Sequence, residues 1–240
     1  MDYEQIIFKE EGPLARISLN RPDKLNAYTP DMGDEIIHAF RRANLNDDIS
    51  SIAFLGVGKS FCAGADRDYL LGDKLSKSGL KIGEDEFISS FVSELSSSKK
   101  ILIAGLKGSC VGIGITMVLP FDIRIAETNS LISFPFIKLG ILPGLASTYF
   151  LRSLVGPNKA KEIILTNAKL TADQANAIGL VNEVVSDGAV EARINEIASS
   201  FGRMNQNLLF AAKEAFQINL EAEVESAIKI ERNLLKNIKK

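Results

Sequence analysis

A mixed α/β fold (α+β in its layout) with a helical C-terminal part is the fold class that the sequence predicts, from three observations. The 240-residue chain is 46% hydrophobic, which is enough to bury one sizeable core. In the first half, short apolar runs of strand type alternate with amphipathic helical runs. From Glu191 to the end the periodicity is helical almost throughout. We therefore expect a core over residues 1–185 and a helical subdomain over 186–240 that packs on the core or on another subunit.

The N-terminal elements begin with a predicted hairpin. The strand-like runs YEQIIFKE and LARISLN flank a turn at Gly12 and Pro13, which is a hairpin signal. A helix is expected from about Asp31, capped after Pro30. His38 lies in its amphipathic run, DMGDEIIHAFRRA, so we expect a structural role for this side chain.

Two further strands, SIAFLGVG and KILIAGLKG, follow with a helical stretch around Asp85 to Ser96 between them. This strand, helix, strand order favours right-handed crossovers. The segment Leu71–Asp85 is rich in Gly, Ser and Lys, and it is either a mobile lid or a plain surface connection.

The part of the chain after Pro143 is predicted to be mostly helical. Within it, TADQANAIGL carries a capping threonine at Thr171 and a helix-ending glycine at Gly179. The lysines at the C-terminus, Lys236, Lys239 and Lys240, look like a solvated helix end.

Composition excludes several classes of function. The 28 Lys and Arg nearly balance the 30 Asp and Glu, and no tract of like charges predicts a nucleic-acid or membrane-surface partner. A single histidine makes a zinc site or a histidine-based triad improbable. Cys62 and Cys110 have no metal spacing and no secretory leader precedes them, which favours a reducing cytoplasm. The longest apolar run, Val111 to Phe121, is far too short to span a membrane.

Two segments carry the chemical signal, GKSFCAGADRDYL and GSCVGIGITMVLP. Each follows an apolar strand with small residues that let backbone N–H groups approach a ligand, and then with a helix start. Two such ends can share one oxygen anion. A phosphate loop is a weaker interpretation, because its lysine and spacing are missing, and Gly112-Ile113-Gly114 lacks the third glycine of a dinucleotide site. Close helix packing by these glycines stays open as well.

A family resemblance is carried by five motifs in order: NRPDKLNAYTPDM (20–32), SFCAGAD (60–66), KGSCVGIGITMVLPFDIRIA (107–126), FPFIKLGILPG (134–144) and LTADQANAIGLVNEVV (170–185). Together they resemble the crotonase, or enoyl-CoA hydratase and isomerase, family from about Ile6 to Val185. The resemblance implies a spiral of β-β-α turns followed by C-terminal helices. It also implies a coenzyme A thioester as substrate, no separate cofactor, and a homotrimer or hexamer.

The site residues follow from this resemblance. The backbone N–H groups of Ala65 and Ile113 match the pair that donates to the thioester carbonyl in relatives. The positions that match those wrapping coenzyme A are Lys24, Leu25, Ala27, Ala63, Gly64 and Asp66, although capping preference favours a helix-start role for Asp66. Asp68 stands where many hydratases place a phosphate-binding lysine, so phosphate contacts are expected from elsewhere, such as Arg67.

The catalytic acids are where the sequence departs from its relatives. The two glutamate positions of hydratases are Thr116 and Phe136, and the acid position of some isomerases is Gly144. None of these three side chains can act as an acid or base unaided. Candidates for an alternative acid are Asp66, Asp68, Tyr69 and Tyr149. Of these, Asp66 is expected to start a helix or fix a loop, and Tyr149 to have a packing role.

Two further explanations stay open. One is chemistry that needs little acid–base help, namely decarboxylation or a double-bond shift in an apolar pocket lined by Phe134, Phe136 and Ile113. The other is a non-catalytic acyl-CoA binder or assembly subunit. An atypical lyase or isomerase is the function that we expect from the sequence, with true hydratase activity doubtful.

Overall fold

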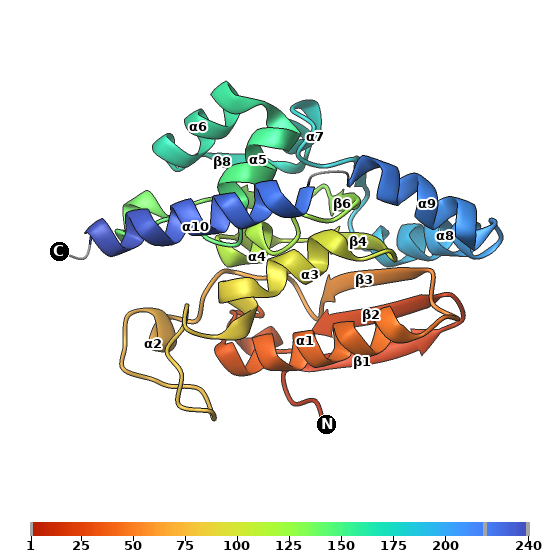
Figure 1. The fold of residues 1–240 in the computed structure, drawn as a ribbon, viewed down its shortest axis with the longest axis horizontal. Coiled ribbons are helices and arrows are strands. Elements are labelled where there is room, and N and C mark those ends of the chain that lie inside the picture. The colour runs from red at the N-terminus through yellow and green to blue at the C-terminus, as the bar shows by residue number, and fades with distance from the viewer. Residues whose placement is uncertain (1, 218–219, 239–240) are drawn as a thin grey trace.

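The computed structural model describes residues 2–217 and 220–238, and it confirms the mixed fold of strands and helices (Figure 1). A six-stranded sheet has the order β1-β2-β3-β4-β6-β9, and a three-stranded sheet has the order β5-β7-β8. The strands are β1 (Ile6–Glu11), β2 (Leu14–Leu19), β3 (Ser51–Gly56), β4 (Ile101–Leu106), β5 (Ser109–Val111), β6 (Ile123–Glu127), β7 (Leu131–Ser133), β8 (Lys169–Thr171) and β9 (Glu183–Val185).

Pairing in the large sheet agrees with the sequence pattern. β1 and β2 form the predicted antiparallel hairpin, and β2, β3, β4, β6 and β9 then pair in parallel. The strands β8 and β9 lie after Pro143, where the pattern predicted mainly helix. Each has only three residues, which is too short for a period-2 pattern to stand out.

The helices are α1 (Pro30–Leu45), α2 (Arg67–Leu70), α3 (Val92–Ser97), α4 (Ile113–Thr116), α5 (Ser147–Val155), α6 (Pro157–Thr166), α7 (Ala172–Ala177), α8 (Val190–Gly202), α9 (Gln206–Phe216) and α10 (Leu220–Ile238). The 3₁₀ turns η1 (Pro22–Lys24) and η3 (Ile137–Leu139) and the π-helix η2 (Phe87–Phe91) complete them. The helix predicted around Asp85–Ser96 is therefore η2 followed by α3.

The start of α1 corrects the prediction by one residue. Pro30 is the first helical residue rather than the residue before the helix, and Thr29 is the N-cap. The Thr29 hydroxyl accepts a hydrogen bond from the Met32 N–H at 3.1 Å. Proline suits this first position because its missing N–H would have no partner there.

Two buried clusters lie on opposite faces of the large sheet, as β3 illustrates. Ile52 and Phe54 point into the main cluster with α1, whereas Ala53 and Leu55 point into a second cluster with α8. This alternation follows from the two-residue period of a strand. A continuous apolar strand, all six residues of which are buried, is thus covered on both faces.

The C-terminal helices contribute side chains to both clusters. Residues of α8 complete the second cluster, and Val224 and Ala227 of α10 belong to the main one. Lys213 of α9 donates from Nζ to the Lys100 carbonyl and to Asp122 Oδ2, both at 2.7 Å. The division of the chain at residue 185, and a role of these helices in oligomer assembly, stay predictions. Lys239 and Lys240 lie outside the described residues.

The segment Leu71–Asp85 forms neither helix nor strand but is anchored to the core. Ser76 and Asp85 are buried within it, and the Lys77 N–H donates to Asp31 Oδ1 at 2.8 Å. Whether it moves as a lid stays a prediction.

No described helix combines the length and apolar content that a membrane crossing requires.

The start of α7 confirms the predicted cap and provides a stability test. The Thr171 hydroxyl accepts from the Gln174 N–H, and the Gln174 side chain accepts from the Thr171 N–H. We expect Thr171→Ala to lower the free energy of unfolding by about 1 kcal/mol, because the Gln174 N–H loses its side-chain acceptor. Urea denaturation measures this change. Thr166→Ala, which removes only a bond to the Glu162 carbonyl one turn back, should have a smaller effect; equal losses would contradict the capping role.

Candidate functional site

The two glycine-containing segments lie side by side in the structure. The Cys62 N–H donates to the Ser109 carbonyl at 3.0 Å, and the Val111 N–H donates to the Cys62 carbonyl at 2.9 Å. On the other side of the same segment, the Tyr28 N–H donates to the Gly64 carbonyl at 2.8 Å. Residues 61–66 are therefore held between two neighbouring stretches of backbone.

This arrangement leaves several N–H groups without a backbone acceptor, and those of Ala65 and Ile113 are among them. Tyr28 bonds to the peptide groups on either side of Ala65, so the N–H of Ala65 points away from Tyr28. Ile113 is the first residue of α4, where N–H groups have no partner within the helix. Within the described ranges, neither the Ala65 nor the Ile113 N–H donates to a backbone carbonyl.

The glycines of the second segment have two different roles. Gly112 has a φ of +54°, and a Cβ on it would meet no atom within 4 Å, so its backbone conformation is what requires glycine. At Gly114, in contrast, a Cβ would lie 2.4 Å from the Cys62 carbonyl oxygen. The close-packing interpretation of the sequence is thus confirmed at Gly114, and Gly112 forms a turn. That these glycines let N–H groups approach a ligand stays a prediction.

The helices that follow the two segments are short. α2 and α4 have four residues each, so their macrodipoles are small. Individual N–H groups, rather than long helices, are the donors that these segments present.

The three positions that match family acids lie in apolar surroundings. Thr116 and Phe136 are 1% and 7% exposed, and Phe136 belongs with Ile113 and Phe134 to the main buried cluster. A Cβ on Gly144 would lie 4.0 Å from Ile88 Cγ2. Ile88 belongs to η2, so the loop around Gly144 and the π-helix face each other.

The side chains considered as replacement acids have other partners or face solvent. Asp66 caps α2 by accepting from the Asp68 N–H at 3.1 Å, and it pairs with Arg21 at 2.9 Å. Asp68 is exposed. The Tyr69 hydroxyl is 3.4 Å from Asp31 Oδ2, at the far limit of a hydrogen bond. The helix-start role that capping preference indicated for Asp66 therefore agrees with its contacts.

Tyr149 also has a structural partner. Its hydroxyl donates to Glu223 Oε2 of α10 at 2.6 Å, and its ring packs edge-on against Phe150. Burial, followed by the bond to Glu223, raises the pKa of this phenol, which makes it a poorer base at neutral pH.

The positions predicted to wrap coenzyme A come from two stretches that are joined. The Ala63 N–H donates to the Leu25 carbonyl at 3.0 Å. Lys24 and Arg67 are exposed, and Leu25 is 44% exposed. The ligand roles of these residues, and of Ala27 and Gly64, stay predictions.

A buried pair that the sequence pattern did not indicate supports the site. The Tyr28 hydroxyl donates to Asp85 Oδ1 at 2.5 Å, and both residues are at most 1% exposed. Burial, and then the Asp85 carboxylate, raise the pKa of Tyr28 well above its usual value. Asp85 also accepts from the Ile88 N–H at 3.1 Å. Tyr28 and Asp85 are 57 residues apart, so no local pattern could have joined them.

Metal or thiol chemistry has little support in the described residues. No group of three or more His, Cys, Asp or Glu is placed there to hold a metal ion. Cys62 and Cys110 are buried free thiols, and burial raises the pKa of Cys62 to about 11. A neutral thiol is a weak nucleophile.

The chain is similar to known proteins in both sequence and structure. Residues 9–240 match the family model described as enoyl-CoA hydratase/isomerase. A crotonyl-CoA hydratase of Syntrophomonas wolfei is 32% identical, over 96% of this chain and 88% of that protein. The enoyl-CoA hydratase structure from Bacillus halodurans has a TM-score of 0.89 at 23% identity, covering 98% of this chain and 95% of that chain. A Thermobifida fusca structure in complex with acetoacetyl-CoA has a TM-score of 0.81 at 26% identity, covering 96% and 95%.

Close packing at Gly114 leads to a prediction on stability. We expect Gly114→Ala to cost about 1 to 3 kcal/mol or more, because the new methyl group meets the Cys62 backbone, which cannot rotate away. Chemical denaturation gives the difference from the wild-type protein. Gly144→Ala is the matched control: its Cβ has only a contact at 4.0 Å, so the change should stay within about 0.5 kcal/mol. Similar losses in the two variants would contradict the packing role of Gly114.

Proposed function

The chain belongs to the enoyl-CoA hydratase/isomerase family, and on that basis we propose that it processes an acyl-CoA thioester with the Ala65 and Ile113 N–H groups as its oxyanion hole. One observation carries this proposal: two paired segments leave these donors without a backbone acceptor. The complex of a structural neighbour with acetoacetyl-CoA supports a thioester ligand. Coenzyme A would then be part of the substrate, and no separate cofactor is required.

The proposed role of the donors is to stabilise an enolate. When the α-carbon of a thioester carries negative charge, most of that charge moves to the carbonyl oxygen. Each preorganised N–H contributes roughly 3 to 4 kcal/mol to such a transition state. Because the donors belong to the backbone, the isoleucine side chain at 113 removes neither of them.

The reaction that we propose is one that produces the enolate with little help from a protein base. In decarboxylation of a carboxyacyl thioester, the bond to the carboxylate carbon breaks and its electron pair forms the enolate. Carbon dioxide leaves, and a water molecule then protonates the α-carbon and remains as hydroxide. The apolar neighbourhood of Ile113, Phe134 and Phe136 favours loss of the carboxylate charge. A double-bond shift with a proton carried by water is the closest variant.

Hydration is less favoured for this chain, although the Syntrophomonas wolfei relative is named a hydratase. Water addition needs one group to activate water and another to deliver a proton. Thr116 and Phe136 stand at those positions, and losing each acid–base group typically costs about 10² to 10⁴ in rate.

A second candidate function is a non-catalytic acyl-CoA binder or assembly subunit. The observation that favours it is that Asp66 and Tyr149 are engaged in protein contacts. We also propose a homotrimer or hexamer in the cytoplasm, as the sequence suggested, without a nucleic-acid or membrane partner.

Mass spectrometry of purified protein with a mixed panel of 2-enoyl, 3-enoyl and carboxyacyl coenzyme A thioesters tests the proposal. We expect carboxyacyl thioesters to lose carbon dioxide, or 3-enoyl thioesters to shift in retention without a mass change. A product that has gained water would contradict the preferred reaction. If no thioester turns over, the dissociation constants of the same thioesters decide between the remaining outcomes. Measurable binding would favour the binder, and no binding at all would refute both candidates.

Ile113 allows a direct test of the oxyanion hole. Ile113→Pro removes the N–H at the first position of α4, which proline tolerates, whereas Ile113→Ala keeps the N–H and removes only the side chain. We expect turnover to fall about 10²- to 10³-fold in the proline variant relative to the alanine variant. Melting temperatures serve as the folding control. Equal turnover in the two folded variants would exclude Ile113 as a donor.

A further inference from the structure

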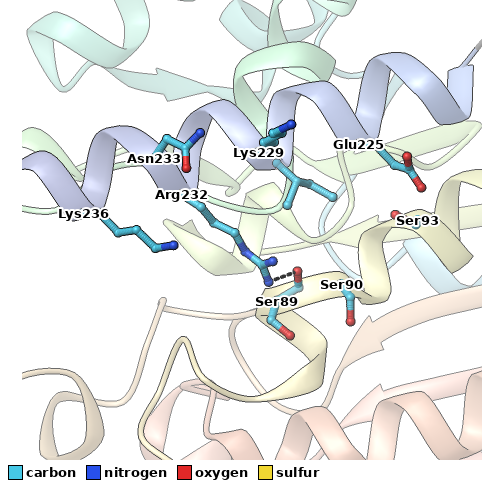
Figure 2. Close-up of a pocket in the computed structure, with 9 residues that line it drawn as sticks. Ser89, Ser90, Ser93, Glu225, Lys229, Arg232, Asn233 and Lys236 are labelled. Atoms are coloured by element: carbon cyan, nitrogen blue, oxygen red, sulfur yellow. Dashed lines mark hydrogen bonds between the residues drawn. The ribbon is translucent and has the colours of Figure 1, made fainter.

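Two consecutive residues of α10 hold two different segments of the candidate site. The Glu231 carboxylate accepts hydrogen bonds from the N–H groups of Ala146 and Thr148 at 3.1 and 3.0 Å, and from the Thr148 hydroxyl at 2.6 Å. The neighbouring Arg232 donates to the Ser89 carbonyl at 2.5 Å, as Figure 2 shows. α10 packs on both α3 and α5 (Figure 1).

The start of α5 depends on Glu231 because it has no cap of its own. Its N-cap residue is Ala146, which offers no side-chain acceptor. Leu145 and Ala146 also have φ values of +60° and +50°, a left-handed conformation that is strained for residues other than glycine. A carboxylate from α10 satisfies the N–H groups that the sequence leaves open. The strained turn that follows Gly144 is thus held from outside.

The opposite segment is the π-helix η2. Arg232 binds its carbonyl at Ser89, and Asp85 binds the N–H of the preceding residue, Ile88, at 3.1 Å. π-Helices are rare and frequently occur at functional sites. The backbone around Ile88 is therefore held at two points. The buried Asp85 carboxylate binds the Ile88 N–H, and Arg232 of α10 binds the carbonyl of the next residue, Ser89.

The two held segments face each other. A Cβ on Gly144 would lie 4.0 Å from Ile88 Cγ2, so this is ordinary contact distance. Because Glu231 holds the Gly144 loop and Arg232 holds the Ile88 helix, a shift of α10 would change the separation of these two groups. Interiors transmit such shifts because they are closely packed.

We propose that Glu231 and Arg232 are positioning residues that set the separation of Ile88 and Gly144, and so determine which acyl groups fit beside the oxyanion hole. The acyl part of this inference rests on the function proposed above. Neither residue needs to touch the substrate. Their role is to keep the Gly144 loop and the Ile88 helix close together, so that small acyl groups fit beside them and larger ones are excluded.

α10 itself offers matched controls. Glu225 and Lys229 lie on the same helix and line the same groove as Arg232 (Figure 2). Both are exposed, and among the described contacts neither side chain bonds to η2 or α5. Glu225→Gln and Lys229→Gln therefore make the same charge changes as Glu231→Gln and Arg232→Gln without releasing either segment.

The first measurement is hydrogen exchange of the protein without ligand. We expect Glu231→Gln to raise exchange around residues 146–150, because glutamine has one acceptor oxygen for three donors and brings an NH₂ group among them. Arg232→Gln should raise exchange around residues 86–92. The two control variants should match the wild-type protein in both regions. Unchanged exchange in the variants of Glu231 and Arg232 would overturn the proposal.

The second measurement compares dissociation constants of butyryl-CoA and octanoyl-CoA, saturated thioesters that cannot be hydrated. We expect each of these two variants to shift the ratio toward octanoyl-CoA by about tenfold, equivalent to about 1.4 kcal/mol. A merely structural role would lower the melting temperature and weaken both ligands equally, which would refute the selection of acyl groups. Because Arg232 is exposed, its variant should fold even if loss of Glu231 proves severe.

The same experiment separates the two proposals. If the wild-type protein binds neither thioester, the proposed function fails and acyl selection fails with it, while the exchange data still decide whether α10 holds both segments. If the wild-type protein binds both thioesters and the ratio is the same in all variants, the proposed function stands and the positioning role is wrong.

Discussion

Backbone pairing of residues 61–66 on both sides is the constraint on which the rest of the site depends. Strand β5 pairs with this segment through Cys62, and Tyr28 pairs with it through Gly64 and Asp66. A backbone held on two sides has little freedom to rotate, so the Ala65 N–H, which has no backbone acceptor, has a defined direction. Glycine at 114 is a consequence, because α4 must start directly against the Cys62 carbonyl.

The proposed oxyanion hole separates the stabilisation of charge from acid–base chemistry. The free N–H groups of Ala65 and Ile113 exist whatever side chains surround them, whereas proton transfer needs particular residues. Thr116, Phe136 and Gly144 can therefore replace acids without disturbing the donors. This is why membership of the family is compatible with a reaction that generates an enolate in another way, and equally with binding alone.

The walls of the site are maintained by contacts between residues that are distant in the chain. Tyr28 and Asp85 are 57 residues apart, and they connect the stretch that pairs with Ala65 to the helix that carries Ile88. Glu231 is 85 residues from Ala146, and Arg232 is 143 residues from Ser89. Buried charged and polar groups of this kind are costly to leave unpaired, so these contacts stabilise one arrangement of the walls.

The sequence by itself determined the strands β1 to β4, the capped start of α7, the two glycine-containing segments and the family. These features depend on short apolar runs, local capping and motif order, which are properties of neighbouring residues. It could not predict β8 and β9, which are too short to show a pattern, or the one-residue shift at Thr29. Only the tertiary structure decided which glycine forms a turn and which permits packing, and which carboxylates are engaged. The physical reason is that Asp85, Glu231 and Arg232 act on segments far away in the chain, where no local pattern relates donor to acceptor.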